Sequence, residues 1–325
     1  MAKSTGTNKE GNNTSLANKV LAVSIVVAVA VVGYAFIASR ALGPFAIAEA
    51  EKGTVGGTAK VIDDTTAAGG KAVQFGPVPV TPPPPSAAVP NGPTGTWNLK
   101  FSDEFAGAAV DTKKWTDESS AEYDGGHGNI KENGELNNQQ LEYNRMANCT
   151  VTNGELSLTA RRQAFTSPSG TKYTWTSCLL SSTPGYAFRY GYIEERSMLP
   201  ANGGFWPAFW TWQAPGVNQW NETDVYEYFT DNHTRLYLSQ HSGTGGSCDY
   251  VPPFDPSAGY HTYGADIQST GTVFYIDGKK VCTASGSHQA NTNIITNLSV
   301  YSQLAPPTST TTAVKKVDYI RAWQR

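Results

Sequence analysis

The stretch WNETDVYEYF at residues 220–229 carries three carboxylates within six positions of an otherwise β-branched and aromatic run. That composition predicts a strand. Successive strand side chains point to opposite faces, so Glu222 and Asp224 share one face. Strict alternation would turn Glu227 toward the core. Either Glu227 points away from the other two, or a β-bulge between Asp224 and Glu227 returns it to their face, and bulges often lie beside active sites.

Three carboxylates on one face repel one another, and this repulsion raises at least one pKa, so that a protonated acid and an ionised base can coexist near neutral pH. Glycoside hydrolysis needs such a pair. A solvated strand edge is the alternative. The aromatic run FWPAFWTW at residues 205–212, followed by Trp220, favours a sugar site because sugar rings stack on aromatic faces. Some of these rings could instead belong to a sandwich core.

These motifs closely resemble glycoside hydrolase family 16, the laminarinase-like β-glucanases, over about residues 97–325. The pattern of Glu222, Asp224 and Glu227 is preceded by GYIEER at 191–196 and LPANGGFWPAFW at 199–210. Further matching segments are FSDEF at 101–105, YHTY at 260–263, YIDG at 275–278 and VDYIR at 317–321. The combination is far more specific than the acidic triplet alone.

The resemblance implies a retaining mechanism with Glu222 as nucleophile, Glu227 as general acid/base and Asp224 tuning charge and orientation between them. It also implies a sugar cleft on the concave face of a jelly roll. Trp206, Trp210 and Trp220 are expected as platforms for sugar rings.

Polar contacts with sugar are expected from Asn138, Gln140 and Glu142, although the usual family sequence in this segment differs from that of this chain. A structural Ca²⁺ on the convex face is common in the family. The matching positions are Glu104, Gly154 and Asp318, and an oxygen-rich site suits this ion. No catalytic cofactor is expected.

Composition indicates an all-β domain, because only 16% of residues are charged and short β-type runs alternate with Gly, Asn, Asp and Pro turns. Such runs in about 230 residues predict a β-sandwich jelly roll of two antiparallel sheets. The expected strands are 96–101, 156–160, 173–181, 188–198, 209–212, 224–230, 234–239, 260–268, 273–276, 297–301 and 316–323. The net charge of −3 gives no indication of the basic surface that nucleic-acid binding requires.

The amino-terminal region predicts export. Residues 1–19 are polar and lysine-rich, and the uncharged apolar run 20–38 is long enough to span a bilayer. The lysines place residues 1–19 in the cytoplasm and the remainder outside. The small residues of AIA at 46–48 suit a signal peptidase, so anchoring and cleavage both stay open. The enzyme is expected at the cell surface or in the medium, as a monomer.

Two further segments precede the expected catalytic domain at 97–325. Residues 49–75 resemble the opening strands of carbohydrate-binding module families 6 and 35, but a piece this short cannot bury a core of its own. It is expected to be a vestige or a hairpin. Residues 76–96 are proline-rich and predict an extended linker that does not pack against the sandwich.

The four cysteines all lie in the exported part, as expected for an oxidising compartment. Three pairings are open. We favour Cys149 with Cys178 and Cys248 with Cys282. Of the histidines that could face the cleft, His241 and His261, we expect His261 to be a structural hydrogen-bonding residue.

The predicted activity is endo-hydrolysis of β-1,3-glucan or mixed β-1,3-1,4-glucan. Agarases and carrageenases share the spacing between Asp224 and Glu227, so they are the enzymatic alternative. A sulfated substrate would call for a basic cleft, and few Lys or Arg residues surround Glu222. A glucan-binding surface protein without catalysis is the third hypothesis, and it would be expected to lack one of the two glutamates.

Overall fold

A computed structural model describes residues 59–63, 71–75, 88–128, 140–232 and 234–325. The chain divides into two compact units, residues 1–81 and 82–325. In the first unit, β1 (Ala59–Asp63) and β2 (Lys71–Phe75) form an antiparallel pair with Ala59 opposite Phe75. The segment at 49–75 therefore contains a hairpin, and its sugar binding stays a prediction.

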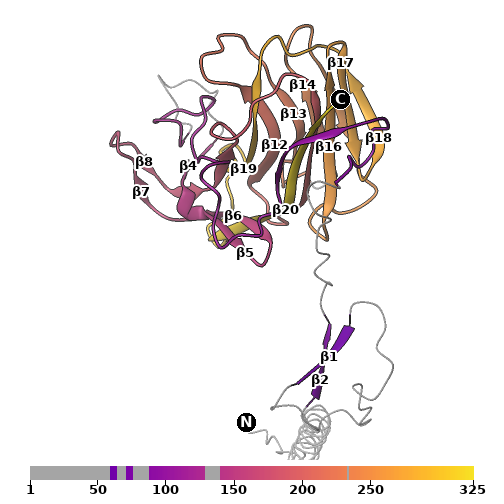
Figure 1. Ribbon diagram of the computed structural model, residues 1–325. Helices are drawn as coiled ribbons and strands as arrows, with labels where there is room; N and C mark the ends of the chain where they lie inside the picture. The colour runs from indigo at the N-terminus through magenta and orange to yellow at the C-terminus, as the bar shows by residue number, and fades with distance from the viewer. Residues whose placement is uncertain (1–58, 64–70, 76–87, 129–139, 233) are drawn as a thin grey trace, which may run out of the picture. The chain divides into compact units, whose positions relative to one another are not determined.

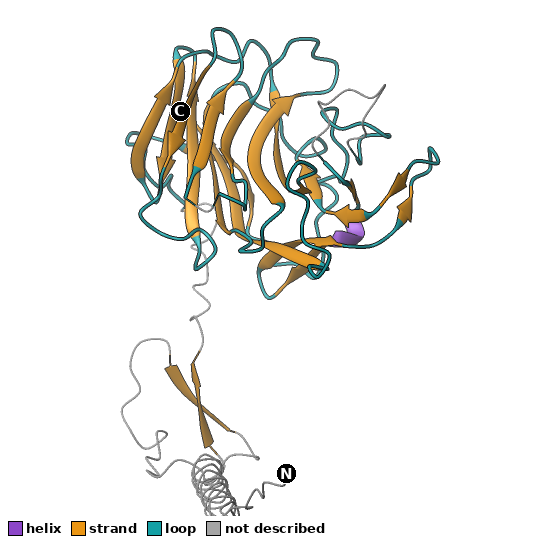
Figure 2. Ribbon diagram, turned by 180° about the vertical axis from the view of Figure 1, so that it is seen from behind, coloured by secondary structure: helices purple, strands orange, loops and turns teal. Residues whose placement is uncertain are grey.

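The second unit is all-β, as predicted, with two large sheets lying face to face (Figures 1 and 2). In the described part of the chain, six strands form one sheet in the order β10 (Leu179–Ser181), β19 (Thr292–Val300), β12 (Phe205–Gln213), β13 (Thr223–Glu227), β14 (Leu236–Gln240) and β15 (Gly246–Tyr250).

The second large sheet has the order β18 (Lys279–Ala284), β17 (Gly271–Ile276), β16 (His261–Gln268), β11 (Gly191–Met198), β20 (Thr312–Gln324), β6 (Glu155–Arg161), β9 (Trp175–Ser177) and β4 (Glu142–Asn144). Two more strands join it, β3 (Asn98–Asp103) on β20 and β5 (Cys149–Thr152) on β6. A separate hairpin consists of β7 (Phe165–Thr166) and β8 (Lys172–Tyr173), and a 3₁₀ helix, η3 (Met146–Asn148), precedes β5.

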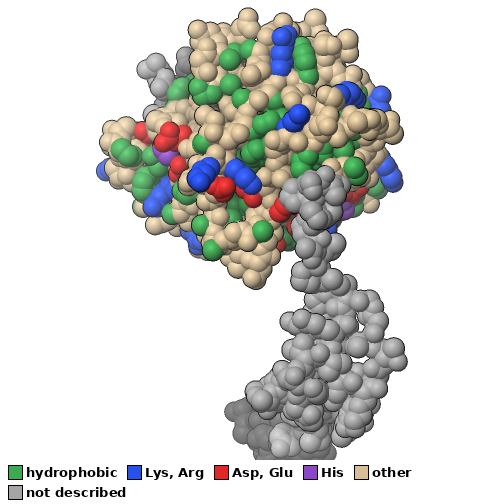
Figure 3. All heavy atoms as spheres, in the orientation of Figure 1, with side chains coloured by type: hydrophobic (Ala, Val, Ile, Leu, Met, Phe, Trp, Pro, Cys, Tyr) green, Lys and Arg blue, Asp and Glu red, His purple; other side chains and the backbone are tan. Residues whose placement is uncertain are grey.

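The core lies between the two large sheets. Along β12 the alternate residues Phe205 and Phe209 are fully buried in it, together with Ile193 of β11 and Phe274 of β17. Each buried aromatic or branched side chain contributes about 1.5–3 kcal/mol. Because strand side chains alternate, β12 turns its other residues to the outer face of the six-stranded sheet. On the face seen in Figure 3, Lys and Arg side chains are scattered among polar and apolar ones.

Two disulfides confirm the favoured pairings. Cys149 of β5 is bonded to Cys178, with Cα atoms 5.2 Å apart, and Cys248 is bonded to Cys282, with Cα atoms 6.4 Å apart. The second bond joins β15 and β18, which end the six-stranded and the ten-stranded sheet. It therefore ties the two layers together at one edge of the sandwich.

The prediction that the proline-rich linker does not pack against the sandwich is wrong for residues 88–96. Ala88 is buried against Tyr192 and Trp323, and the Trp323 indole donates to the Ala88 carbonyl at 3.0 Å. Asn91 bridges two strands, because its backbone N–H donates to Glu194 Oε2 at 3.0 Å and its amide to Thr262 Oγ1 at 2.8 Å. A short extended segment can thus satisfy its backbone and side-chain polar groups by hydrogen bonding to side chains on the face of a sheet.

The predicted membrane helix at 20–38 and the rest of residues 1–58 lie outside the described residues. In the part of the chain that the structure does describe, no helix has the length and apolar character needed to cross a bilayer.

Candidate active site

The acidic strand β13 contains the predicted bulge. On β12, Trp210 pairs with Asp224 and Ala208 pairs with Glu227, so two steps along β12 match three along β13. The same mismatch occurs on β14, where Ser239 pairs with Asp224 and Tyr237 with Glu227. The extra residue returns Glu227 to the face of Asp224. The bulge prediction is confirmed.

The core side of this bulge is held by a buried ion pair. Val225 and Tyr226 are both fully buried, and the Tyr226 hydroxyl donates to Glu195 Oε1 at 2.8 Å. Lys315 Nζ lies 3.0 Å from the same oxygen and donates to the carbonyl of Ala208 at 2.8 Å. Ala208 is the partner of Glu227, so the pair links β11 and β20 of one sheet to the strands that carry the acids.

A cleft brings the acids together with aromatic and polar side chains. Glu222, Asp224 and Glu227 all line it. The other lining residues are Ala121, Glu122, Gln140, Trp206, Ala208, Trp210, Trp212, Asn297 and Ser299. Of the described residues that line this cleft, none is Lys or Arg.

Burial raises the pKa values of all three acids, and the charges of neighbouring acids further raise those of Glu222 and Glu227. Burial and the charge of Asp224 raise the pKa of Glu222 to about 7. Burial raises the pKa of Asp224 to about 7. Burial, followed by the charges of Asp224 and Glu222, raises the pKa of Glu227 to about 8. Glu227 thus holds its proton to the highest pH of the three, as an acid catalyst requires.

One histidine completes this cluster. His241 Nε2 lies 2.8 Å from Asp224 Oδ2, and the His241 ring stacks on Trp220 with centroids 5.6 Å apart and planes 5° from parallel. The Trp220 indole N–H donates to Glu222 Oε2. The charge of His241 opposes the rise in the pKa values of Glu222 and Glu227. Trp220 is 59% exposed, so its outer face is open to a ligand.

The aromatic wall comes from the outward-facing residues of β12. Trp206 stacks on Phe229 with ring centroids 5.0 Å apart, and the Trp210 indole N–H donates to Asn297 Oδ1 at 3.0 Å. Trp212 packs edge-on against Trp210 at 6.0 Å. Trp206 and Trp210 lie where the prediction needs them, and their sugar contacts stay a prediction.

The predicted polar contacts divide into three cases. Gln140 lines the cleft, with its amide donating to Ser299 Oγ at 2.6 Å. Glu142 does not line it. Glu142 is 1% exposed, and its Oε2 accepts the backbone N–H of Val300 at 2.8 Å. Glu142 therefore stabilises the backbone at Val300 and does not contact the cleft, so the predicted sugar contact of Glu142 is wrong. Asn138 lies outside the described residues.

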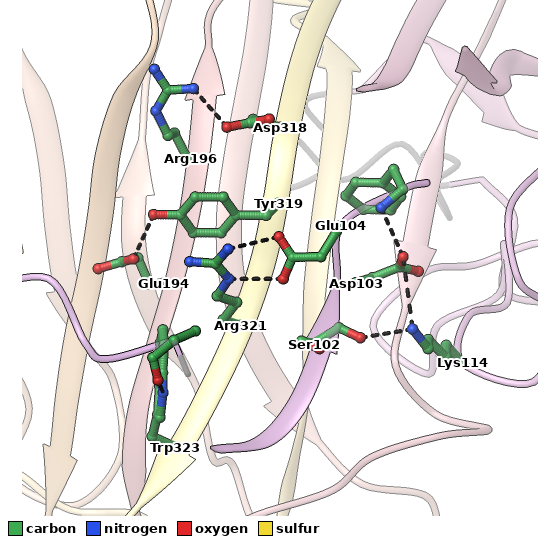
Figure 4. Close-up of polar contacts among 12 residues, drawn as sticks. Ser102, Asp103, Glu104, Lys114, Glu194, Arg196, Asp318, Tyr319, Arg321 and Trp323 are labelled. Carbon is green, nitrogen blue, oxygen red and sulfur yellow. Dashed lines mark hydrogen bonds and ion pairs between the residues drawn. The ribbon is translucent and has the colours of Figure 1, made fainter. Parts of the chain in front are cut away.

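The predicted calcium positions lie along one stretch of β20 and its neighbours. Glu104 follows β3 and forms a bidentate ion pair with Arg321, at 2.8 and 2.7 Å (Figure 4). Asp318 Oδ2 accepts a hydrogen bond from Arg196 Nη1 at 2.6 Å. Gly154 has φ 77° in the turn between β5 and β6. The ligands expected from Glu104 and Gly154 are backbone carbonyls, which the ion pair of Glu104 leaves available, whereas the carboxylate expected from Asp318 is paired with Arg196. Calcium binding stays a prediction.

His261 is structural, as expected. Its Nδ1 lies 2.7 Å from Asp277 Oδ2, and its ring stacks on Phe254 with centroids 3.5 Å apart. It does not line the cleft.

Comparison with known proteins decides the family. The family model described as glycosyl hydrolases family 16 matches residues 136–321, more than half of the chain. The chain belongs to this family. The matched region contains Glu222, Asp224 and Glu227, so the glycoside hydrolase family 16 assignment and the cleft coincide.

Two curated relatives of the family 16 chain come from Rhizobium meliloti. The endo-1,3-1,4-beta-glycanase EglC is 30% identical over 54% of this chain, and the endo-1,3-1,4-beta-glycanase ExsH is 28% identical over 72%. The matches span 39% and 48% of the lengths of these two relatives. Among solved structures, an endo-beta-1,3-glucanase from Pyrococcus furiosus is 25% identical with a TM-score of 0.60, covering 70% of this chain and 94% of that one.

The family 16 cleft also contains residues that the sequence analysis did not select. Trp212 lies in the quoted aromatic run, and its alternation with Trp206 and Trp210 could have identified it. Asn297 and Ser299 show the same alternation on β19. Glu122 lies in a loop and carries no pattern that marks it. These residues reach the cleft through contacts between distant segments.

Proposed function

We propose that this chain is an endo-β-glucanase that hydrolyses β-1,3-glucan or mixed β-1,3-1,4-glucan with retention of anomeric configuration. The observation that carries the proposal is the bulge in β13, which brings Glu227 to the face of Asp224 in a tryptophan-lined cleft. The names of the two Rhizobium relatives and of the Pyrococcus glucanase support the same substrate class.

In this mechanism Glu222 attacks the anomeric carbon while Glu227 protonates the leaving oxygen, which breaks the glycosidic bond and forms a glycosyl ester. Retaining enzymes hold the two carboxyls about 5 to 5.5 Å apart. The charge of Glu222 is one cause of the high pKa of Glu227. Glu227 has by then given its proton to the leaving oxygen. Because the charge of Glu222 disappears in the ester, the pKa of Glu227 falls, so Glu227 stays ionised and can take a proton from the attacking water.

Asp224 and His241 shift the pKa values of Glu222 and Glu227 in opposite directions. Asp224 raises the pKa of both glutamates, whereas the charge of His241 lowers them. The titration therefore belongs to the cluster as a whole rather than to any one group. Proton exchange within it keeps one acid protonated and one base ionised near neutral pH.

The cleft favours an uncharged polysaccharide. Trp206, Trp210 and Trp220 offer apolar ring faces, which suit sugar rings. The described lining carries four carboxyls, Glu122 included, and no cation. This disfavours sulfated carrageenan, while agarose remains the neutral alternative and a non-catalytic glucan-binding protein remains the other class.

Export and calcium binding belong to the same proposal. Two disulfides suit an oxidising compartment, so the catalytic unit is exported and is either anchored through residues 20–38 or released. A structural Ca²⁺ would be held by carbonyl oxygens of Glu104 and Gly154 and by the carboxylate of Asp318, away from the cleft. The proposed enzyme needs no catalytic cofactor and acts as a monomer.

The decisive experiment measures reducing-sugar release from laminarin, lichenan, agarose and carrageenan. We expect activity on laminarin, with or without lichenan. Activity on agarose or carrageenan alone would replace the glucanase proposal with the enzymatic alternative. Binding of laminarin without any hydrolysis would favour the non-catalytic surface protein.

A further inference from the structure

A fourth carboxyl lies in the cleft wall outside the bulged strand. Glu122 belongs to a loop closed by hydrogen bonds from Ser119 N to the Gly126 carbonyl at 3.0 Å and from Gly128 N to the Tyr123 carbonyl at 3.0 Å. Glu122 lines the same cleft as Glu222, Asp224 and Glu227. Its Oε2 atom is buried and has no hydrogen-bond partner within the described residues. A buried polar atom without a partner is unfavourable, so a bound ligand that satisfies it gains affinity.

The neighbours of Glu122 place it across the cleft from the reacting acids. It interacts with the side chain of Gln140, which is bonded to Ser299 of β19. In the six-stranded sheet, β19 and β13 flank β12 on opposite sides. Glu122 therefore borders the part of the cleft floored by β12 and β19, whereas Glu222 and Glu227 border the part floored by β13.

Among the described residues that line the cleft with Glu122, the only other ionisable groups are carboxyls. The charge of Glu142 on β4 acts on Glu122, the carboxyls of Glu222, Asp224 and Glu227 line the same cleft, and the lining residues of β12 and β19 are uncharged. Burial, then the charge of Glu142, raises the pKa of Glu122 to about 8, against the opposing hydrogen bond of Gln140. At neutral pH the carboxyl is protonated and offers an O–H donor.

We propose that Glu122 contacts substrate as a neutral acid, donating a hydrogen bond to a hydroxyl of an uncharged sugar unit held over β12 and β19. This inference rests on the proposed glucanase function and adds a specificity-determining residue to it. A sulfate or carboxylate on that sugar would lie among the carboxyls of the cleft, whose described lining contains no Lys or Arg, and would be rejected. The neutral hydroxyls of a glucan can accept the hydrogen bond that Glu122 donates.

The test compares Glu122→Gln with Glu122→Ala on laminarin. Gln keeps an N–H donor of similar shape and cannot ionise, so KM at pH 6.5 should stay within about twofold of wild type, while Ala should raise KM about tenfold with little change in kcat. Glu118→Gln is the matched control. It lies in the same loop with a side chain 61% exposed, does not line the cleft, and should leave KM unchanged.

The pH dependence supplies a readout that a structural role would not move. Above pH 8 wild-type Glu122 loses its proton and its donor, so wild-type KM should rise relative to that of Glu122→Gln. Glu227 titrates in the same range but is present in both enzymes, so the ratio of their KM values isolates Glu122. This comparison holds even if Glu122→Ala fails to fold.

Two results would overturn the inference: a wild-type KM for Glu122→Ala at pH 6.5, or a ratio of wild-type to Glu122→Gln KM that does not change between pH 6.5 and 9. Mobility in native gels containing laminarin measures binding without catalysis. If wild type hydrolysed no glucan, the proposed function would fail, and loss of retardation in Glu122→Ala alone would still support the sugar contact. In that case, equal retardation of all variants would refute the sugar contact of Glu122.

Discussion

His241 Nε2 lies 2.8 Å from Asp224 Oδ2, which couples an imidazole on one side of the bulged strand to the central acid of the cluster. Hydrolysis requires Glu222 to be ionised and Glu227 to be protonated. The rate should therefore rise with pH through the pKa of Glu222, about 7, and fall above that of Glu227, about 8. The positive charge of His241 lowers both values.

Replacing His241 by Phe keeps a ring to stack on Trp220 but removes the charge. Both pKa values should rise, so both limbs of the kcat/KM profile should move to higher pH. If the acidic limb moves by about one pH unit, the rate at pH 6 should fall about tenfold. His261→Phe is the control, since His261 contacts Asp277 away from the cleft. An unchanged profile, or one displaced to lower pH, would exclude a charged His241 in the cluster.

Azide should distinguish the two glutamates. Replacement of either by Ala should reduce hydrolysis of a β-glucan by several orders of magnitude. In Glu222→Ala, azide attacks an activated aryl glycoside directly and yields an α-glycosyl azide after one inversion. In Glu227→Ala, azide intercepts the glycosyl ester and yields the β-anomer after two. Proton NMR identifies the products. The opposite anomers would exchange the two roles, and α-anomeric product released first by wild type would refute retention.

The buried ion pair of Lys315 and Glu195 should be important for stability. Lys315→Met leaves Glu195 buried without its cation, and loss of one partner of such a pair typically costs about 3–5 kcal/mol. Urea denaturation of Lys315→Met measures this loss. Lys316→Met is the matched control, because Lys316 forms its ion pair with Glu155 at the surface, with a side chain 39% exposed. Equal stability of the two variants would show that the buried pair contributes no more than a surface one.

Residues 88–96 should stabilise the sandwich. A fragment that starts at Trp97 loses the hydrogen bonds of Ala88 and Asn91 to Trp323, Glu194 and Thr262. At about 1 kcal/mol each, these bonds imply a Tm lower by roughly 6–12 °C than that of fragment 88–325. Calorimetry of the two fragments measures the difference. Identical Tm values would mean that this segment adds no net stability.

Calcium, if bound at the convex face, should affect stability and leave the reaction unchanged. With Ca²⁺ at 100 times its Kd, binding adds about 2.7 kcal/mol, so chelation should lower Tm by roughly 5–10 °C. The initial rate at low temperature should not change. Asp318→Asn should remove the effect of the chelator. A rapid loss of activity that Ca²⁺ restores, with the fold intact, would place the ion in the cleft.

Local sequence determined the parts of this protein that depend on spacing along one strand. The alternation of side chains placed Glu222 and Asp224 together, and the offset of Glu227 predicted the bulge that the pairing of β12, β13 and β14 confirms. The same period-2 pattern predicted the all-β sandwich and put Trp206 and Trp210 on one face of β12. Motif spacing was sufficient for the family.

Only the tertiary structure decided which distant segments meet. Glu122 reaches the cleft from a loop, and Glu142 turns behind the wall to bind Val300, 158 positions further along the chain. The last linker residues bury Ala88 on Trp323, 235 positions away. No local period encodes such contacts, because they arise when two sheets pack and buried polar groups must find partners wherever the fold brings them.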